Sequence, residues 1–192
     1  MLRSRGGQIA LAIAGLLVLQ AVVLLAYRLI ETRREGAAAP LRFERVNGTV
    51  PAPALLLERP DGTLASITPG RQGEAVLVHF WATWCPPCRE ELPALIALGR
   101  KLTGAGRVRV VAVATDREWD QIRSFFKGDL PEEVFRDATG SAYRSYRVSS
   151  LPDTYLVSGD GLVRIRFAGA QDWRSPVVRK ALLDELKRQG DT

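Results

Sequence analysis

Cys85 and Cys88 are the only cysteines of the 192-residue chain, and two prolines separate them. Thiols at this spacing can form a small disulfide ring and take part in thiol–disulfide exchange. A helical pattern begins directly after Cys85, so this sulfur is expected where free backbone N–H groups and the helix dipole stabilise a thiolate. Cys85 is therefore the predicted nucleophile. Cys88, one turn into the helix, is the predicted resolving thiol.

The two prolines between the cysteines favour a reducing couple. Pro86 and Pro87 have no N–H to donate to sulfur and they stiffen the ring, so the Cys85 thiolate gains less stabilisation. A structural disulfide and half of a zinc site are the alternatives. A structural bridge normally closes a longer loop, and zinc needs further ligands that the single histidine, His79, does not easily supply. The pattern predicts redox chemistry without a metal or cofactor.

Two ionisable residues near the cysteines are candidate proton acceptors. Glu91 follows Cys88 by three residues and so shares its helix face, where a carboxylate could accept the proton of that thiol. His79 lies in the apolar stretch before Cys85, and a histidine there titrates near neutrality and could relay the same proton. The alternatives are an acid that only complements the helix dipole and a hydrogen-bonded core histidine.

Apolar β-branched runs alternate with helical spacings along the chain. An early pair of short strands with an Asp-Gly turn precedes them, and a final helix opens at Ser175-Pro176. This order predicts an α/β fold, a mixed central sheet flanked by helices with an added N-terminal hairpin. In chain order the predicted elements are a hairpin, strand, helix, strand, helix, short helix, hairpin and helix, over residues 50–70, 74–83, 86–102, 107–115, 116–130, 138–146, 151–169 and 175–188.

The start of the chain predicts one transmembrane helix. Residues 9–30 carry no charge before Arg28, and their number matches the roughly 20 residues that cross a bilayer. This apolar run is longer than that of a cleaved signal peptide, which favours an uncleaved anchor. The predicted organisation is an N-terminal tip and anchor over residues 1–30, a linker over 31–45 and a folded domain over 46–192. Arginines lie on both sides of the apolar run, so the positive-inside rule leaves its orientation open.

The positive net charge of +6 does not indicate a nucleic-acid partner. Residues 1–40 contain five arginines and two glutamates, so the remaining chain keeps 22 basic and 19 acidic groups. Its basic residues are scattered, with no run of five or six and no interleaved aromatic residues. The folded part is expected to have a mixed, soluble surface.

The segment FWATWCPPCREELPAL resembles the active-site segment of the membrane-anchored thioredoxin-like proteins of the TlpA, ResA and CcmG (DsbE) group. Residues 50–67 resemble the N-terminal hairpin of that family, and residues 146–169 resemble its cis-proline loop and closing hairpin. The resemblance runs from about Val46 to Leu186. It implies a thioredoxin-like fold, preceded by the transmembrane helix, whose domain faces the extracytoplasmic space.

The resemblance also implies roles for individual residues. Cys85 attacks, Cys88 resolves, and Pro152 is a cis-proline that faces the disulfide, for which an X-Pro bond between a polar loop and a strand is well suited. The implied client-binding residues are Trp84 at the rim, Pro86, Pro87, Leu151 through its backbone groups, and Pro152. Glu91 matches an acidic residue that the family uses near its active site. His79 departs from the pattern, because thioredoxins carry Asp there and many TlpA-like proteins carry Asn.

These features together predict a thiol:disulfide oxidoreductase that reduces protein disulfides. The resemblance implies a single-pass protein of the cell inner membrane with its N-terminal tip in the cytoplasm and its catalytic domain in the periplasm, or on the outer face of a cell without one. Its expected clients are the CxxCH cysteines of apocytochrome c or a copper-site assembly protein, and its expected electron donor is a membrane thiol carrier of the DsbD or CcdA kind. A disulfide-forming oxidase and a copper-handling metal chaperone are the alternatives, although Met1 is the only methionine that could add a thioether ligand.

Overall fold

The computed structural model describes residues 13–26, 43–70, 74–103 and 108–190. Contacts divide the chain into two units, residues 1–39 and 40–192. In the first unit, residues 13–26 form a helix. The predicted transmembrane segment 9–30 therefore lies partly outside the described residues, and within them no helix is both long and apolar enough to cross a membrane.

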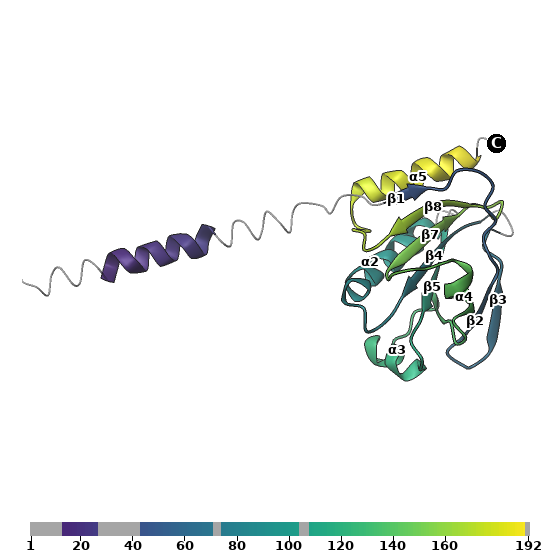
Figure 1. Cartoon of the computed structure of the whole chain (residues 1–192), viewed down its shortest axis with the longest axis horizontal. Coiled ribbons are helices and arrows are strands. Elements are labelled where there is room, and N and C mark those ends of the chain that lie inside the picture. Colours follow the sequence, from purple (N-terminus) through teal and green to yellow (C-terminus); the bar gives the residue numbers. More distant parts are fainter. Residues whose placement is uncertain (1–12, 27–42, 71–73, 104–107, 191–192) are drawn as a thin grey trace, which may run out of the picture. The chain divides into compact units, whose positions relative to one another are not determined.

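The second unit is built around a mixed sheet, which over the described residues has eight strands in the order β1-β8-β7-β4-β5-β6-β2-β3 (Figure 1). The strands are β1 (Phe43–Arg45), β2 (Leu55–Glu58), β3 (Leu64–Ile67), β4 (Ala75–Trp81), β5 (Val108–Ala114), β6 (Val134–Arg136), β7 (Asp153–Val157) and β8 (Val163–Ala168). The helices of this unit are α2 (Pro86–Thr103), α3 (Trp119–Phe125), α4 (Ser141–Ser145) and α5 (Pro176–Gly190).

Strand β4 lies inside the sheet and leads directly to the cysteines. It pairs in parallel with β5 and antiparallel with β7. All seven of its residues are buried, which explains its unbroken apolar sequence. Because side chains alternate along a strand, Leu77, His79 and Trp81 face one side of the sheet, while Val78 and Phe80 face the other. His79 therefore lies in the layer between the sheet and α2.

The two faces of the sheet have separate apolar cores. Helices α2, α3 and α5 contribute to the core on the face of Leu77 and Trp81. The β2–β3 hairpin and α4 contribute to the core on the face of Phe80. In Figure 1, α2 and α4 lie on different sides of the central strands. Because both faces of the sheet are covered, its interior strands are apolar along their whole length. The first turn of α2 follows shortly after the end of β4.

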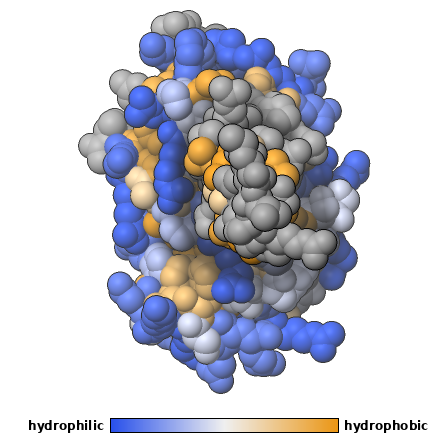
Figure 2. Space-filling model, turned by 90° about the vertical axis from the view of Figure 1, so that its left-hand side faces the viewer, coloured by the Kyte–Doolittle hydropathy of each residue, from blue (hydrophilic) through white to orange (hydrophobic). Residues whose placement is uncertain are grey.

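The predicted α/β fold with a mixed sheet and an N-terminal hairpin is confirmed. Helix α2 begins at Pro86 as expected, and the Ser175 hydroxyl caps α5 by accepting the N–H of Val177 at 3.2 Å. The folded part starts before the predicted boundary at residue 46, because β1 pairs with β8. The rest of the predicted linker, residues 31–42, lies outside the described residues. Hydrophilic residues occupy much of the surface in Figure 2, as the balanced charge predicts.

Candidate active site

Cys85 and Cys88 form a disulfide at the start of α2. Their sulfur atoms are 2.06 Å apart, and the N–H of Cys88 donates to Cys85 Sγ at 3.4 Å. Cys85 is 5% exposed and Cys88 is fully buried. Cys85 is thus the more accessible sulfur, at the end of the helix where the macrodipole stabilises negative charge. This asymmetry agrees with the predicted division between an attacking and a resolving thiol.

Pro86 and Pro87 occupy the first two positions of α2 and both are exposed. Proline suits the first turn because the N–H that it lacks would have no partner within the helix. The same property keeps two donors away from the Cys85 sulfur. The structure therefore agrees with the expectation that this thiolate receives few hydrogen bonds.

His79 and Glu91 form one buried pair beneath the disulfide segment. The His79 Nδ1 atom lies 2.8 Å from the Thr154 hydroxyl and 3.8 Å from Glu91 Oε1. Thr154 is the direct neighbour of His79 across the β4–β7 pairing, so the sheet register fixes this contact. The sequence pattern indicates His79 and Glu91 as alternative candidates for the proton acceptor. The structure places them side by side.

Burial sets the charge of both members of this pair. Loss of hydration raises the pKa of Glu91 to about 7, although the N–H of Gln171 and the indole of Trp173 both lower it. Burial also lowers the pKa of His79 to about 3. At neutral pH the imidazole is therefore uncharged and the carboxyl group is close to half ionised. The contact between them is not a salt bridge under these conditions.

Only one of the two carboxyl oxygens of Glu91 has a hydrogen-bond partner among the described residues. Its Oε2 atom accepts a hydrogen bond from the Gln171 N–H at 2.5 Å, whereas Oε1 has no hydrogen-bond partner. A group with a pKa near neutrality and one unpaired oxygen can accept a proton at the pH of most cells. Glu91 therefore has the chemical properties that a base for the Cys88 thiol needs.

Two of the five predicted client-binding residues, Trp84 and Leu151, line one hollow, whereas Pro86, Pro87 and Pro152 are not among its lining residues. The Leu151–Pro152 peptide bond is cis, as the sequence indicated. Trp84 is 66% exposed, and together with Leu151 it lines a hollow of about 350 Å³. The other lining residues belong to the ends of β5 and β6 and to α4, namely Thr115, Asp116, Arg117, Asp137, Ala138, Gly140 and Tyr143. The binding of a client here stays a prediction.

Asp116 fixes the loop that carries Trp84. Its buried carboxylate accepts hydrogen bonds from the Thr83 N–H at 3.1 and 3.2 Å and from the Thr83 hydroxyl at 2.5 Å. These bonds join the end of β5 to the loop between β4 and α2. The loop that carries Trp84 is consequently held in place by hydrogen bonds to a residue at the end of a strand of the sheet.

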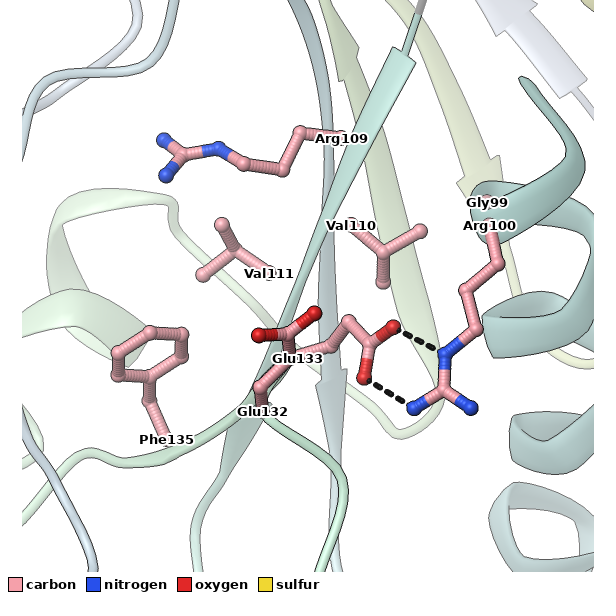
Figure 3. A pocket seen from close by; sticks show the side chains of 8 residues that line it. All are labelled: Gly99, Arg100, Arg109, Val110, Val111, Glu132, Glu133 and Phe135. Carbon is pink, nitrogen blue, oxygen red and sulfur yellow. Dashed lines mark hydrogen bonds and ion pairs between the residues drawn. The ribbon is translucent and has the colours of Figure 1, made fainter. Parts of the chain in front are cut away.

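A second hollow lies far from the cysteines along α2. It measures about 340 Å³ and is lined by Gly99 and Arg100 from the end of that helix and by residues of β5 and the β6 region. Figure 3 shows Arg100 and Glu133 facing each other, with bonds of 2.6 and 2.9 Å, and Arg109 extending above Val111. Cys85 precedes the opposite end of α2, so this hollow is separate from the redox site. Among the described residues, no group of three or more His, Cys, Asp or Glu side chains could hold a metal ion.

A family model described as the AhpC/TSA family matches residues 49–166, more than half of the chain. The chain belongs to the AhpC/TSA family. It is 34% identical over 117 residues to the thioredoxin-like protein YneN of Bacillus subtilis, covering 59% of this chain and 66% of that protein. It is 32% identical over 124 residues to the thiol:disulfide interchange protein DsbE of Haemophilus influenzae, covering 62% and 65%. It is also 34% identical over 101 residues to the thiol-disulfide oxidoreductase ResA of Bacillus thuringiensis, covering 52% and 58%. The chain thus spans less than two thirds of the length of these relatives.

Solved structures identify the fold of this AhpC/TSA member. A DsbE-type thiol:disulfide interchange protein from Chlorobium tepidum is 26% identical, with a TM-score of 0.63 over 73% of this chain and 99% of that chain. StoA from Bacillus subtilis is 23% identical, with a TM-score of 0.56 over 71% and 99%, and supports the fold alone. The fold is thioredoxin-like, and the resemblance to the TlpA, ResA and CcmG group is confirmed.

Sequence reasoning missed several residues that surround the His79–Glu91 pair. Thr154, Gln171 and Trp173 come from β7 and from the segment after β8, far from the cysteines in the chain. Gln171 acts through its backbone N–H, which no residue pattern can indicate. Asp116 offered a signal, because it follows a buried strand whose carboxyl end lies beside the end of β4.

Proposed function

We propose that this protein is a thiol:disulfide oxidoreductase that reduces disulfides in client proteins through Cys85 and Cys88. The observation that carries the proposal is the disulfide at the start of α2, in which Cys85 is 5% exposed and Cys88 is fully buried, with Glu91, a carboxyl group of raised pKa, one helical turn after Cys88. The names of its relatives, thiol-disulfide oxidoreductase ResA and thiol:disulfide interchange protein DsbE, support the same activity.

The reaction starts from the reduced pair. The Cys85 thiolate attacks one sulfur of a client disulfide, forms a mixed disulfide with it and displaces the other client sulfur as a thiolate, which takes up a proton. Cys88 then transfers its proton to Glu91, and its thiolate attacks the sulfur of Cys85. This step closes the Cys85–Cys88 disulfide and releases the second client thiolate. The client gains two electrons and two protons, and the cysteine pair loses them.

Pro152 and Leu151 serve the first of these steps. The resemblance to the TlpA, ResA and CcmG group implies that the backbone of Leu151, just before the cis-proline, pairs with an extended client segment. Trp84 lines the same hollow as Leu151 and directly precedes Cys85, so it can contact the client beside the reacting sulfur. These residues orient the client, while the chemistry belongs to the two sulfurs and Glu91.

The midpoint potential of the Cys85–Cys88 couple tests the direction of the reaction. We expect a value near that of thioredoxin, about −270 mV, because the prolines withhold donors that would stabilise a thiolate. A value near that of a strong oxidant, about −120 mV, would contradict the proposal and favour a disulfide-forming oxidase. Equilibration with glutathione or dithiothreitol, followed by alkylation and mass analysis, measures it.

We further propose that the protein is anchored in the inner membrane with its domain in the periplasm or on the outer face, and that apocytochrome c is its client. The apolar residues 9–30 and the resemblance to membrane-anchored relatives support the location, where disulfides persist and a DsbD or CcdA type carrier must supply electrons. A Cys88→Ser variant should retain clients as mixed disulfides at Cys85. Enrichment of CxxCH proteins is the expected result, and enrichment of a copper-site assembly protein instead would redirect the client assignment.

A further inference from the structure

The segment between β8 and α5 joins the two halves of the candidate site. The N–H of Gly169 donates to the carbonyl of Pro152 at 2.9 Å, which holds the cis-proline. Two residues later, the N–H of Gln171 donates to Glu91 Oε2 at 2.5 Å. The Gln171 side chain closes the segment by donating to the Gly169 carbonyl at 3.1 Å. The client-binding proline and the proton acceptor are thus attached to one short stretch of backbone.

Trp173, at the end of this segment, supplies a further donor. It is only 2% exposed, and its ring packs edge-on against Phe167 with a centroid distance of 5.2 Å. Its indole N–H and the Oε1 atom of Glu91 are both buried, and neither completes a hydrogen bond in this structure. The Trp173 indole nonetheless lowers the pKa of Glu91. A buried donor and a buried acceptor that both lack partners are costly, and their pairing would relieve both.

We propose that residues 169–173 form a positioning segment for the resolving step, in which the Gln171 N–H fixes one oxygen of Glu91 and the Trp173 indole N–H pairs with the other when the carboxylate is charged. The role rests on the proposed oxidoreductase function. Asp172, the one charged residue of the segment, is exposed and accepts the N–H of Arg174 at 3.0 Å, so the segment acts on Glu91 through N–H dipoles and not through a charge. It can therefore make Glu91 easier to ionise without binding it in a permanent salt bridge.

The other groups near Glu91 in the described part of the chain carry no charge that would override the effect of these N–H donors on its pKa. From β4, His79 Nδ1 lies 3.8 Å from Oε1, and burial keeps its ring uncharged at neutral pH. Thr154 on β7 presents a neutral hydroxyl to His79. On α2 the titratable partner is Cys88, which holds no charge in the disulfide. No charged side chain contributes to the pKa shift of Glu91, so an N–H donor has a measurable influence on it.

The test compares Trp173→Phe with Trp81→Phe. The first change keeps an aromatic ring against Phe167 and removes the indole N–H together with part of the bicyclic ring, and Trp81→Phe removes the same atoms. Trp81 is a matched control because it is also buried on the same side of the sheet and its indole nitrogen also has no hydrogen-bond partner, yet it does not influence the pKa of Glu91. Infrared titration of the oxidised protein reads the carboxyl band of Glu91, which Glu91→Gln identifies. Single-turnover release of a mixed disulfide gives the second readout as a function of pH.

Removing a donor to the charged form raises the pKa. We expect Trp173→Phe to move the titration of Glu91 up by about one pH unit and to slow release below neutrality by up to about tenfold, with recovery at high pH. Trp81→Phe should leave both midpoints in place. An unmoved titration in Trp173→Phe, an equal shift in Trp81→Phe, or a release profile that does not follow the titration would each overturn the positioning role. If the wild-type protein releases no client at all, the proposed function fails as well, and the infrared titration, which needs no client, distinguishes the two cases.

Discussion

At the scale of single residues, burial decides which of His79 and Glu91 can act as a base. Burial depresses the pKa of the imidazole to about 3 and raises that of the carboxyl group to about 7. A base works best when its pKa is close to the ambient pH, so Glu91 meets the requirement and His79 does not. The histidine instead lies between the Thr154 hydroxyl, at 2.8 Å, and the Glu91 carboxyl group, at 3.8 Å, where it can act as a positioning residue.

We therefore expect Glu91→Gln to slow the resolving step more than His79→Asn. In the wild type, release should rise with pH as Glu91 ionises around pH 7 and then level off. Without the carboxylate that rise disappears, and the rate near neutrality should fall by about 100-fold, recovering only when Cys88 ionises by itself. An asparagine can still contact Thr154, so His79→Asn should cost about threefold or less. Stopped-flow measurement of release across the pH range provides the comparison.

Attack by Cys85 is the internal control for both variants, because Glu91 and His79 do not act on the first step. If Glu91→Gln releases client at the wild-type rate at every pH while His79→Asn is slow, the proton acceptor is the histidine. A deficit that stays constant with pH would instead indicate damaged packing around α2.

Three of the residues that sequence reasoning identified near the site share one property. Cys85, Cys88 and Glu91 are linked by helical spacing, so their proximity follows from the local pattern. The contacts of Gln171 and Trp173 with Glu91 depend on how the chain returns after β8, which no local pattern encodes. Their discovery required the fold.

At the scale of elements, strong periodic signals predicted the strand and helix that create the site. Strand β4 is an unbroken buried run, and α2 opens with two prolines, so both were predicted to within a few residues. Strands β1 and β6 have three residues each, which is too short for an alternating pattern to emerge. They form through pairing with β8 and with β5 and β2, a tertiary effect that overrides weak local preference.

Close packing of α2 on the sheet explains why Glu91 reaches His79. A Cβ atom at Gly99 would come within 2.2 Å of Val110 Cγ2, so this glycine lets the end of α2 approach β5 closely. The approach of the helix also brings its earlier turns toward β4, where His79 lies. Gly99, near the end of α2 opposite to the cysteines, therefore permits the close packing of this helix on the sheet. The sequence pattern alone indicates only that Gly99 lies within a helix.

At the scale of the whole molecule, the division into residues 1–39 and 40–192 separates the proposed anchor from the redox unit. The family match over residues 49–166 lies entirely within the second unit. The cysteines, the cis-proline, Glu91 and the positioning segment all belong to that unit as well. Its chemistry should therefore be independent of the first 40 residues.

We expect a variant that lacks residues 1–40 to keep the midpoint potential and the release kinetics of the full chain but to lose function in the cell. The cut preserves β1, whose Phe43 pairs with Phe167 on β8, whereas a cut at the sequence-predicted boundary of residue 46 would remove that edge strand. Function in the cell should be lost because the soluble variant no longer has a high local concentration near its membrane partners. The proposed tether would confine the domain near its membrane donor and clients, and without it each encounter would become bimolecular.

The decisive comparison exports the soluble variant to the same compartment at the same abundance as the full chain. A second variant carries an unrelated single-span anchor and a tether of equal length in place of residues 1–40. If confinement is the only contribution of the native segment, the substitute anchor restores function and the soluble form does not. Full activity of the soluble form would show that the first unit is dispensable. Failure of the substitute anchor, with the native chain active, would assign residues 1–40 a specific contact in addition to tethering.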